Sequence, residues 1–196
     1  MNYIQKEFKY ASNNYKSIAR VMIRGQGIYV YDQNNKAYMD CISGYSALNQ
    51  GHCHPTLIKE MNKQSKLLTL TSRAYHNNKL GEYSELLCKT FNYDKVLLMN
   101  GGIEAGESSI KIARAWGYKK KGIPQNEAIN IFFNNNFWGR SIAACSSSND
   151  PSCYNNFGPY TKGFTLLDYN NINQLEDYLR RTPNVASIML EPIQGE

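Results

Sequence analysis

The sequence predicts an α/β fold in which helices flank a mostly parallel central sheet. The chain of 196 residues is long enough to bury a sizeable core. Hydrophobic residues make up 42% of it and charged residues 19%, which is the composition of a globular protein. From residue 95 onward, short apolar runs of strand length alternate with segments of helical periodicity. This alternation is typical of a parallel sheet covered by helices on both faces.

The N-terminal part is predicted to contain a small β segment. Residues 27–32 and 37–41 are apolar and rich in tyrosine, and the polar tetrapeptide between them is typical of a short turn. We therefore expect a β-hairpin here. Residues 12–15 are predicted to form a turn that presents a tyrosine. The long polar loop over residues 43–55 is of a kind that is more often functional than structural.

The later elements follow in order along the chain. Pro55 can begin a helix, and apolar residues recur after it at near-helical spacing, as far as Leu68. The asparagines at positions 77 and 78 are expected to cap a second helix, whose apolar stripe extends to Phe91. The remaining expected elements are a buried strand at 95–99, a helix after Gly102, strands at 128–133, 163–167 and 186–190, and a short helix at 172–180.

Gly101 and Gly102 lie where the expected strand at 95–99 meets the next helix. Glycine adopts backbone angles closed to other residues, and the free N–H groups at a helix start favour an anion, reinforced by the helix dipole. A phosphate group fits such a place. Paired glycines before a helix are nevertheless more often an ordinary turn, so the sequence here supports both interpretations.

A second cluster, residues 136–140, is expected in the loop after the strand at 128–133. Its arginine suits two-point binding of a carboxylate, and the aromatic residues before it offer a face for a planar ligand, although they also fit an ordinary core. Glu191 and Glu196 follow the strand at 186–190, as solvated loop ends or as groups of a site. Ligands bind at the carboxyl ends of parallel strands, which makes these loops candidates for one site.

Charge and motif content disfavour several classes of protein. The net charge is +6, but the compact basic run at residues 119–121 falls at an expected helix end, where cations complement the dipole. His52, Cys53 and His54 lack a second ligand cluster, so we expect no metal site. No apolar run approaches the roughly 20 residues of a membrane span. The opening residues resemble no leader. We therefore expect a cytoplasmic protein with no nucleic-acid or membrane partner.

Five cysteines are too sparse for a disulfide framework, so reduced thiols are expected. Cys145 and Cys153 are separated by a short polar stretch that contains proline and can fold back on itself. They form a candidate redox-sensitive pair.

Several segments, which span residues 12 to 196, resemble the class III pyridoxal-phosphate aminotransferases in order and spacing. The segments similar to the whole class are residues 100–107, 136–140 and 191–196. Those similar to its ornithine-specific branch are residues 43–55, residues 70–74 and Trp138, where acetylornithine relatives usually carry histidine. The resemblance implies a truncated fold-type I transferase. Residues 1–50 would be an N-terminal segment, and residues 51–196 the first part of the large cofactor-binding domain.

The resemblance also implies roles for individual residues. Those expected at pyridoxal phosphate are Gly101, Gly102, Ile103, Phe137, Trp138 and Glu191, with Phe137 stacked on the pyridine ring. Those expected at the substrate are Tyr15 at the amine, Tyr45 in the pocket wall, Arg140 at the α-carboxylate and Glu196 in a gate. Gly101 departs from the family, since relatives usually carry threonine there; the change removes a hydroxyl but keeps the N–H.

The implied reaction transfers the δ-amino group of L-ornithine to a 2-oxo acid such as 2-oxoglutarate, giving glutamate 5-semialdehyde and glutamate in a homodimer that serves proline biosynthesis. The family places the cofactor-binding lysine and the aspartate at the pyridinium nitrogen beyond Glu196. We therefore expect no catalytic residue in residues 1–196, and no activity from them alone. Alternatives are a sister enzyme for acetylornithine or another ω-amine, and a non-catalytic truncated module.

Overall fold

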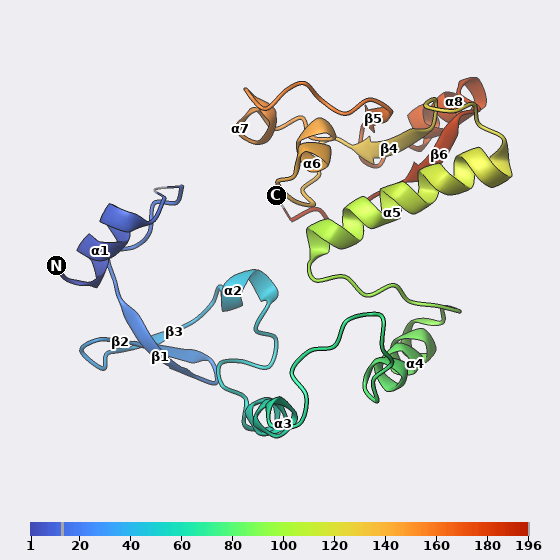
Figure 1. Ribbon diagram of the computed structural model, residues 1–196. Helices are drawn as coiled ribbons and strands as arrows, with labels where there is room; N and C mark the ends of the chain where they lie inside the picture. The colour runs from blue at the N-terminus through green and yellow to red at the C-terminus, as the bar shows by residue number, and fades with distance from the viewer. Residues whose placement is uncertain (13, 196) are drawn as a thin grey trace. The chain divides into compact units, whose positions relative to one another are not determined.

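The computed structural model of the protein describes residues 1–12 and 14–195. The chain divides into two compact units, Met1–Glu85 and Leu86–Glu196, and each contains a three-stranded sheet. Figure 1 traces the elements in chain order. The division falls within one helix, α4 (Leu80–Phe91).

The sheet of the first unit is antiparallel, in the order β1-β2-β3. Its strands are β1 (Met22–Gln26), β2 (Tyr29–Asp32) and β3 (Ala37–Met39). The predicted hairpin, formed by β2 and β3, is confirmed, and β1 adds a strand that the sequence analysis did not identify. Helix α1 (Tyr3–Tyr10) was also missed, although Asn2 and Gln5 form a capping box at its start.

Asp32 holds the hairpin turn together. Its side chain is buried, and Oδ1 accepts hydrogen bonds from the N–H groups of Asn34, at 2.9 Å, and Lys36, at 3.0 Å. Its Oδ2 accepts from the hydroxyl of Tyr38 at 3.0 Å. The buried carboxylate therefore has a hydrogen-bond donor for each oxygen, as burial requires.

The helices of the first unit follow the predicted pattern, with one exception. Helix α3 (Pro55–Ser65) begins at the expected proline but ends before Leu68. Helix α4 also begins as predicted, because Asn77 Oδ1 accepts hydrogen bonds from the N–H groups of Lys79 and Leu80. The predicted turn at residues 12–15 includes residue 13, which lies outside the described residues.

A short turn, α2 (Ser43–Ser46), has an uncommon backbone. Its residues have φ values of +50°, +58°, +55° and +66° in chain order, so the whole turn lies in the left-handed region. Gly44 takes this conformation freely, whereas each other residue in it costs roughly 1–2 kcal/mol. The surrounding contacts must therefore hold this turn in place.

The second unit contains the parallel sheet, in the order β5-β4-β6. Its strands are β4 (Ile129–Phe133), β5 (Phe164–Leu167) and β6 (Val185–Ile188). Its helical elements are α5 (Gly102–Trp116), the π-helical turn η1 (Gly117–Lys121), α6 (Ile142–Ser146), α7 (Pro151–Tyr154) and α8 (Ile172–Arg181). The predicted α/β architecture is confirmed, and Figure 1 shows α5 running along the sheet.

Successive side chains of β4 point to opposite faces of the sheet. Ile131 and Phe133 lie in a core that is covered by Leu175 and Tyr178 of α8. Phe132 faces the other way and stacks on Trp138, with ring centroids 5.9 Å apart and planes 12° apart. Both faces of the central strand are therefore covered, as predicted.

The strand predicted at residues 95–99 is wrong. The segment belongs to no strand of the described residues, and Val96, Leu97 and Met99 are exposed. An apolar run becomes a strand only where a neighbouring strand pairs with its backbone, and the described sheet contains β5, β4 and β6 alone.

Asn130 is a polar residue at the centre of the parallel sheet, with an exposed fraction of 0%. Its Oδ1 accepts a hydrogen bond from Ser187 Oγ of β6 at 2.7 Å, and its Nδ2 lies 3.5 Å from the carbonyl oxygen of Gly163, just before β5. One amide side chain thus connects the central strand with both of its neighbours.

Replacing Asn130 with alanine should destabilise the protein by about 2–3 kcal/mol, because it leaves a cavity and deprives Ser187 of its acceptor. Urea or thermal unfolding measures the loss. Ser187→Ala is the matched control and should cost less, since it removes the donor alone and leaves the packing of Asn130 in place. Equal stability of the wild-type protein and Asn130→Ala would contradict this account.

Candidate functional site

The first turn of α5 is a cradle with open space in front of it. Gly101 is the N-cap residue and has no side chain with which to cap the N–H groups of that turn. A Cβ placed on Gly101 or Gly102 would meet no atom within 4 Å. The φ of Gly101 is −152°, an extended conformation open to any residue, so the unused space, and not conformational freedom, distinguishes this glycine.

Glu104 fixes the segment of chain that leads into the cradle. Its carboxylate turns back and accepts hydrogen bonds from the backbone N–H of Asn100, at 2.9 Å, and from the Asn100 side chain, at 3.4 Å. An acidic group in the first turn also complements the helix dipole. The chain is therefore fixed just before it enters α5.

The loop after β4 is attached to the sheet and to the end of α6 by Asn136. Its Nδ2 donates hydrogen bonds to the carbonyl oxygens of Phe133, at 2.8 Å, and Ser147, at 2.6 Å. Ser141 then caps α6 by accepting a hydrogen bond from the N–H of Ala144. Both ends of the cluster at residues 136–140 are thus anchored.

Two glycines, one in this loop and one in α5, let the loop pack closely against α5, because each lies against a side chain of the other segment. Gly139 has a φ of +149°, and a Cβ there would overlap with Cδ1 of Ile103. A Cβ on Gly106, one turn further along α5, would lie 2.7 Å from the Trp138 ring. Both positions therefore require glycine as the chain now packs.

The Trp138 ring lies between the sheet and α5. It stacks on Phe132, contacts Gly106, and donates its Nε1–H to Ser147 Oγ at 2.8 Å. These contacts orient the loop that carries Phe137 and Arg140. A direct contact of Trp138 with a cofactor stays a prediction.

Phe137 and Arg140 lie beside each other on the open side of this loop. The Arg140 guanidinium carbon lies 5.1 Å from the centroid of the Phe137 ring, which is cation–π distance. Phe137 donates its backbone N–H to Glu191 Oε2 at 3.2 Å. Three predicted site segments, the α5 cradle, residues 136–140 and Glu191, therefore lie together in one unit.

Two residues that the sequence analysis did not single out hold the segment after β6. Tyr169 donates its hydroxyl to the carbonyl oxygens of Glu191, at 2.8 Å, and Pro192, at 2.9 Å. Gln194 Nε2 donates to the carbonyl oxygen of Asn134 at 2.7 Å. Gln194 lies in the segment 191–196, but that segment did not indicate these contacts for Gln194 or Tyr169, since both contacts depend on how distant loops meet.

A polar cavity of about 340 Å³ opens beside Phe137 and Arg140. It is lined by Asn135, Asn136, Phe137, Arg140, Asp150, Ser152 and Cys153. Hydrogen bonds from Ser152 lower the pKa of Asp150. Burial and the hydrogen bond to Asp150 raise the pKa of the Cys153 thiol. Cys145 and Cys153 are both free thiols.

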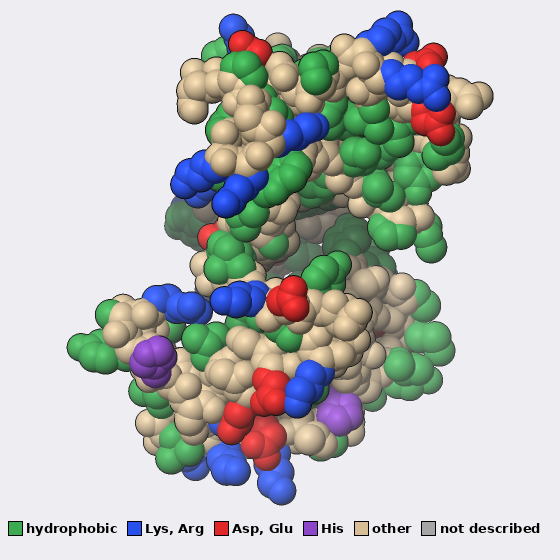
Figure 2. All heavy atoms as spheres, turned by 90° about the vertical axis from the view of Figure 1, so that its right-hand side faces the viewer, with side chains coloured by type: hydrophobic (Ala, Val, Ile, Leu, Met, Phe, Trp, Pro, Cys, Tyr) green, Lys and Arg blue, Asp and Glu red, His purple; other side chains and the backbone are tan. Residues whose placement is uncertain are grey.

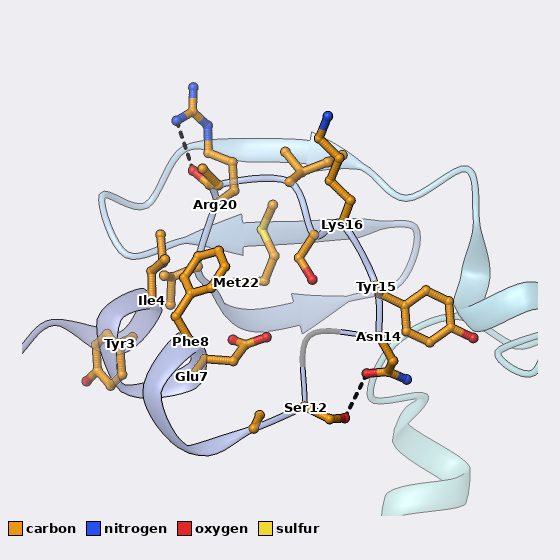
Figure 3. Close-up of a pocket in the computed structure, with 15 residues that line it drawn as sticks. Tyr3, Ile4, Glu7, Phe8, Ser12, Asn14, Tyr15, Lys16, Arg20 and Met22 are labelled. Carbon is orange, nitrogen blue, oxygen red and sulfur yellow. Dashed lines mark hydrogen bonds between the residues drawn. The ribbon is translucent and has the colours of Figure 1, made fainter.

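The remaining predicted site residues lie elsewhere. Tyr15 lines a pocket of about 710 Å³ beside α1 in the first unit, and Figure 3 shows its ring pointing away from that helix. Tyr45 lies in the left-handed turn α2 and is 86% exposed. Glu196 lies outside the described residues. How these three relate to the cradle stays a prediction.

The described part of the chain contains no group of three or more acidic, His or Cys side chains that could hold a metal ion. Within residues 1–12 and 14–195, no helix has both the length and the apolar character needed to cross a membrane.

Comparisons with known proteins agree with one another. Residues 10–196 match the family model Aminotransferase class-III. The mitochondrial ornithine aminotransferase of Drosophila ananassae is 50% identical over 191 residues, which cover 97% of this chain and 44% of that protein. The chain therefore spans less than half the length of this curated relative.

Two solved structures are also similar to the chain. An ornithine aminotransferase from Toxoplasma gondii, described with partial occupancy of PLP at its active site, matches with 48% identity and a TM-score of 0.94, over 98% of this chain and 45% of that one. An acetylornithine aminotransferase from Elizabethkingia anophelis matches with 39% identity and a TM-score of 0.83, over 99% and 44%.

The family match covers nearly the whole chain, and the similar structures have the predicted fold, which is therefore confirmed as that of the fold-type I PLP-dependent enzymes. That fold includes the parallel sheet, the cradle at the start of α5 and the loop after β4. The chain belongs to the class III aminotransferases.

Proposed function

We propose that the full-length protein containing this chain is a pyridoxal-phosphate-dependent ornithine aminotransferase, with a 2-oxo acid as amino acceptor. The observation that carries the proposal is the 50% identity to an ornithine aminotransferase over nearly the whole chain. Trp138 supports the same choice, since the acetylornithine branch usually carries histidine there.

The residues at the cradle fit the proposed cofactor. The open space before Gly101 and Gly102 leaves room for a phosphate group, and the N–H groups of the first α5 turn and the helix dipole favour its charge. Phe137 is half-buried, which leaves part of its ring available for stacking. Pyridoxal phosphate, when bound, supplies an electron sink for the transfer of an amino group.

The chain's own residues would bind and orient the substrate. Arg140 carries a planar guanidinium suited to two-point binding of an α-carboxylate. Its contact with the Phe137 ring would keep it next to the cofactor face. Tyr15 would contact the substrate amine, Tyr45 would shape the pocket for the ornithine side chain, and Glu196 would contribute to a gate. Residues 1–196 alone would lack turnover, because the family carries its cofactor-binding lysine beyond them.

We further propose that the active protein is a homodimer in the cytoplasm. Large apolar side chains reach the surface of both units, and Figure 2 shows many of them on one face. Examples from the second unit are Leu97, Ile112 and Trp116, with exposed fractions of 57%, 57% and 50%. Such surface is costly in water, so burial against the rest of a longer protein and a second copy would stabilise it.

The full-length protein should bleach its pyridoxal absorbance on addition of ornithine and turn over ornithine in preference to N-acetylornithine. Arg140→Lys should raise KM for ornithine by about tenfold or more, because a single ammonium cannot bind a carboxylate at two points. Arg114→Lys is the matched control, since Arg114 also lies 5.1 Å from an aromatic ring, that of Phe164, and is not a predicted site residue.

Three results would contradict the proposal. Preference for N-acetylornithine would identify the sister enzyme instead, and absence of a pyridoxal band would favour the non-catalytic module. An equal change of the KM for ornithine in both arginine variants would show that Arg140 has no specific role in binding the α-carboxylate.

Gly101→Thr should strengthen cofactor binding by about fivefold, because the space before Gly101 accommodates the side chain and a hydroxyl adds about 1 kcal/mol as a hydrogen bond to phosphate. The measurement is the dissociation constant of pyridoxal phosphate from the full-length protein. Gly101→Ala adds the Cβ without the hydroxyl and should leave the constant unchanged. Weaker binding by the threonine variant would place the phosphate elsewhere.

We also propose that Cys145 and Cys153 form a redox-sensitive pair. The raised pKa of Cys153 keeps its thiol protonated at neutral pH, so oxidation should be slow at pH 7 and faster as the pH rises and the thiolate forms. Mass spectrometry of the oxidised protein should detect the two peptides linked, and Cys88→Ser should not alter this. Two freely alkylatable thiols after oxidation would contradict the pairing.

A further inference from the structure

A hydrogen bond between the side chains of Asp40 and His52 closes the loop between these two residues in the first unit. Oδ2 of Asp40 lies 2.7 Å from Nε2 of His52, with both side chains largely buried. The backbone fixes the same two ends. Asp40 donates its N–H to the carbonyl oxygen of Ile28, and His52 exchanges two hydrogen bonds with Gly27. Both ends of the loop are therefore anchored on the connection between β1 and β2.

The His52 end is held by shape as well as by hydrogen bonds. A Cβ on Gly25 would lie 2.6 Å from Cγ of His52, so the imidazole packs directly on the β1 backbone. A Cβ on Gly51 would lie 2.7 Å from the carbonyl oxygen of Gly27. The imidazole therefore has little freedom to move, and it fixes the carboxylate of Asp40 in turn.

The other oxygen of Asp40 contacts the start of the left-handed turn α2. Oδ1 accepts hydrogen bonds from the N–H groups of Ile42, at 3.0 Å, and Ser43, at 2.9 Å. The hydrogen bond with His52 is the largest cause of a lowered pKa at Asp40, and the hydrogen bonds from the N–H groups of Ser43 and Ile42 lower it further. The carboxylate is therefore charged at neutral pH. At the far side of the turn, the N–H of Leu48 donates to the carbonyl oxygen of Ser43.

The turn depends on these contacts because its conformation is unfavourable for three of its four residues. Ser43, Tyr45 and Ser46 have φ values of +50°, +55° and +66°. Side-chain-bearing residues persist in that region only where the surroundings hold them. The Tyr45 side chain itself is 86% exposed, so it adds little to its own placement within this unit.

We propose that Asp40 is a positioning residue for Tyr45, holding the left-handed turn with one carboxylate oxygen and the sheet-anchored His52 with the other. The inference rests on the proposed function, in which Tyr45 shapes the pocket for ornithine. Asp40 touches neither substrate nor cofactor in this account; it acts through the direction in which the turn presents the tyrosine.

Asp32 provides a matched control in the same sheet. Its carboxylate also accepts two backbone N–H groups and one side-chain hydrogen bond, but the turn that it holds, at residues 33–36, carries no predicted site residue. Substitution of either aspartate should therefore lower the stability of the protein, whereas only substitution of Asp40 should change ornithine binding.

The test uses the full-length protein with its cofactor and compares Asp40→Ala, Asp40→Asn and Asp32→Ala. Asp40→Ala should raise KM for ornithine by about tenfold, since small displacements of a binding group have effects of this size or larger. KM for the 2-oxo acid should change little. Asp40→Asn keeps an oxygen for the two N–H groups and should restore most of the ornithine affinity. Hydrogen exchange of amides 42–48 should be faster in Asp40→Ala and unchanged in Asp32→Ala.

The remaining outcomes distinguish a failure of this inference from a failure of the proposed function. A wild-type protein that does not use ornithine would overturn both. An active wild type with equal ornithine KM in Asp40→Ala would overturn the inference alone, whether or not exchange is faster. So would equal increases of ornithine KM in Asp40→Ala and Asp32→Ala, because they would reduce the effect to stability.

Discussion

Parallel pairing of β4 with β6 is the constraint on which the candidate site depends. Ile131 lies opposite Ile188, and both strands run in the same direction, so their carboxyl ends reach the same edge of the sheet. The chain leaving β4 and the chain leaving β6 are thereby brought within one hydrogen bond of each other, from Phe137 N–H to the Glu191 carboxylate. An antiparallel pairing would have placed these two loops at opposite edges.

Packing onto α5 then fixes the third part of the site. Gly139 lies against Ile103 and Gly106 against the Trp138 ring, so the loop approaches the first two turns of the helix more closely than a side chain at either glycine would permit. The cradle and the loop at residues 136–140 are consequently held close together. Their relative position follows from steric fit, whereas the Phe137–Arg140 face of the loop stays open toward the cavity.

The sequence predicts most regular elements, because periodicity and capping are local. Pro55 and Asn77 mark helix starts, and the apolar runs that become β4, β5 and β6 are evident. The expected strand at residues 95–99 is wrong because strand formation depends on a partner. The site motifs are equally visible, but the supporting residues Ser147 and Tyr169 are not, since their contacts with Trp138 and Glu191 connect positions that only folding brings together.

The contact between Gly106 and Trp138 couples the sizes of the side chains at two positions. A Cβ at residue 106 fails only because the indole occupies its place, at 2.7 Å, so the size of one side chain limits the size of the other. A smaller ring at position 138 would release this limit, and alanine at 106 would then fit. A substitution that shortens the side chain at position 138 alone would therefore leave a void against α5.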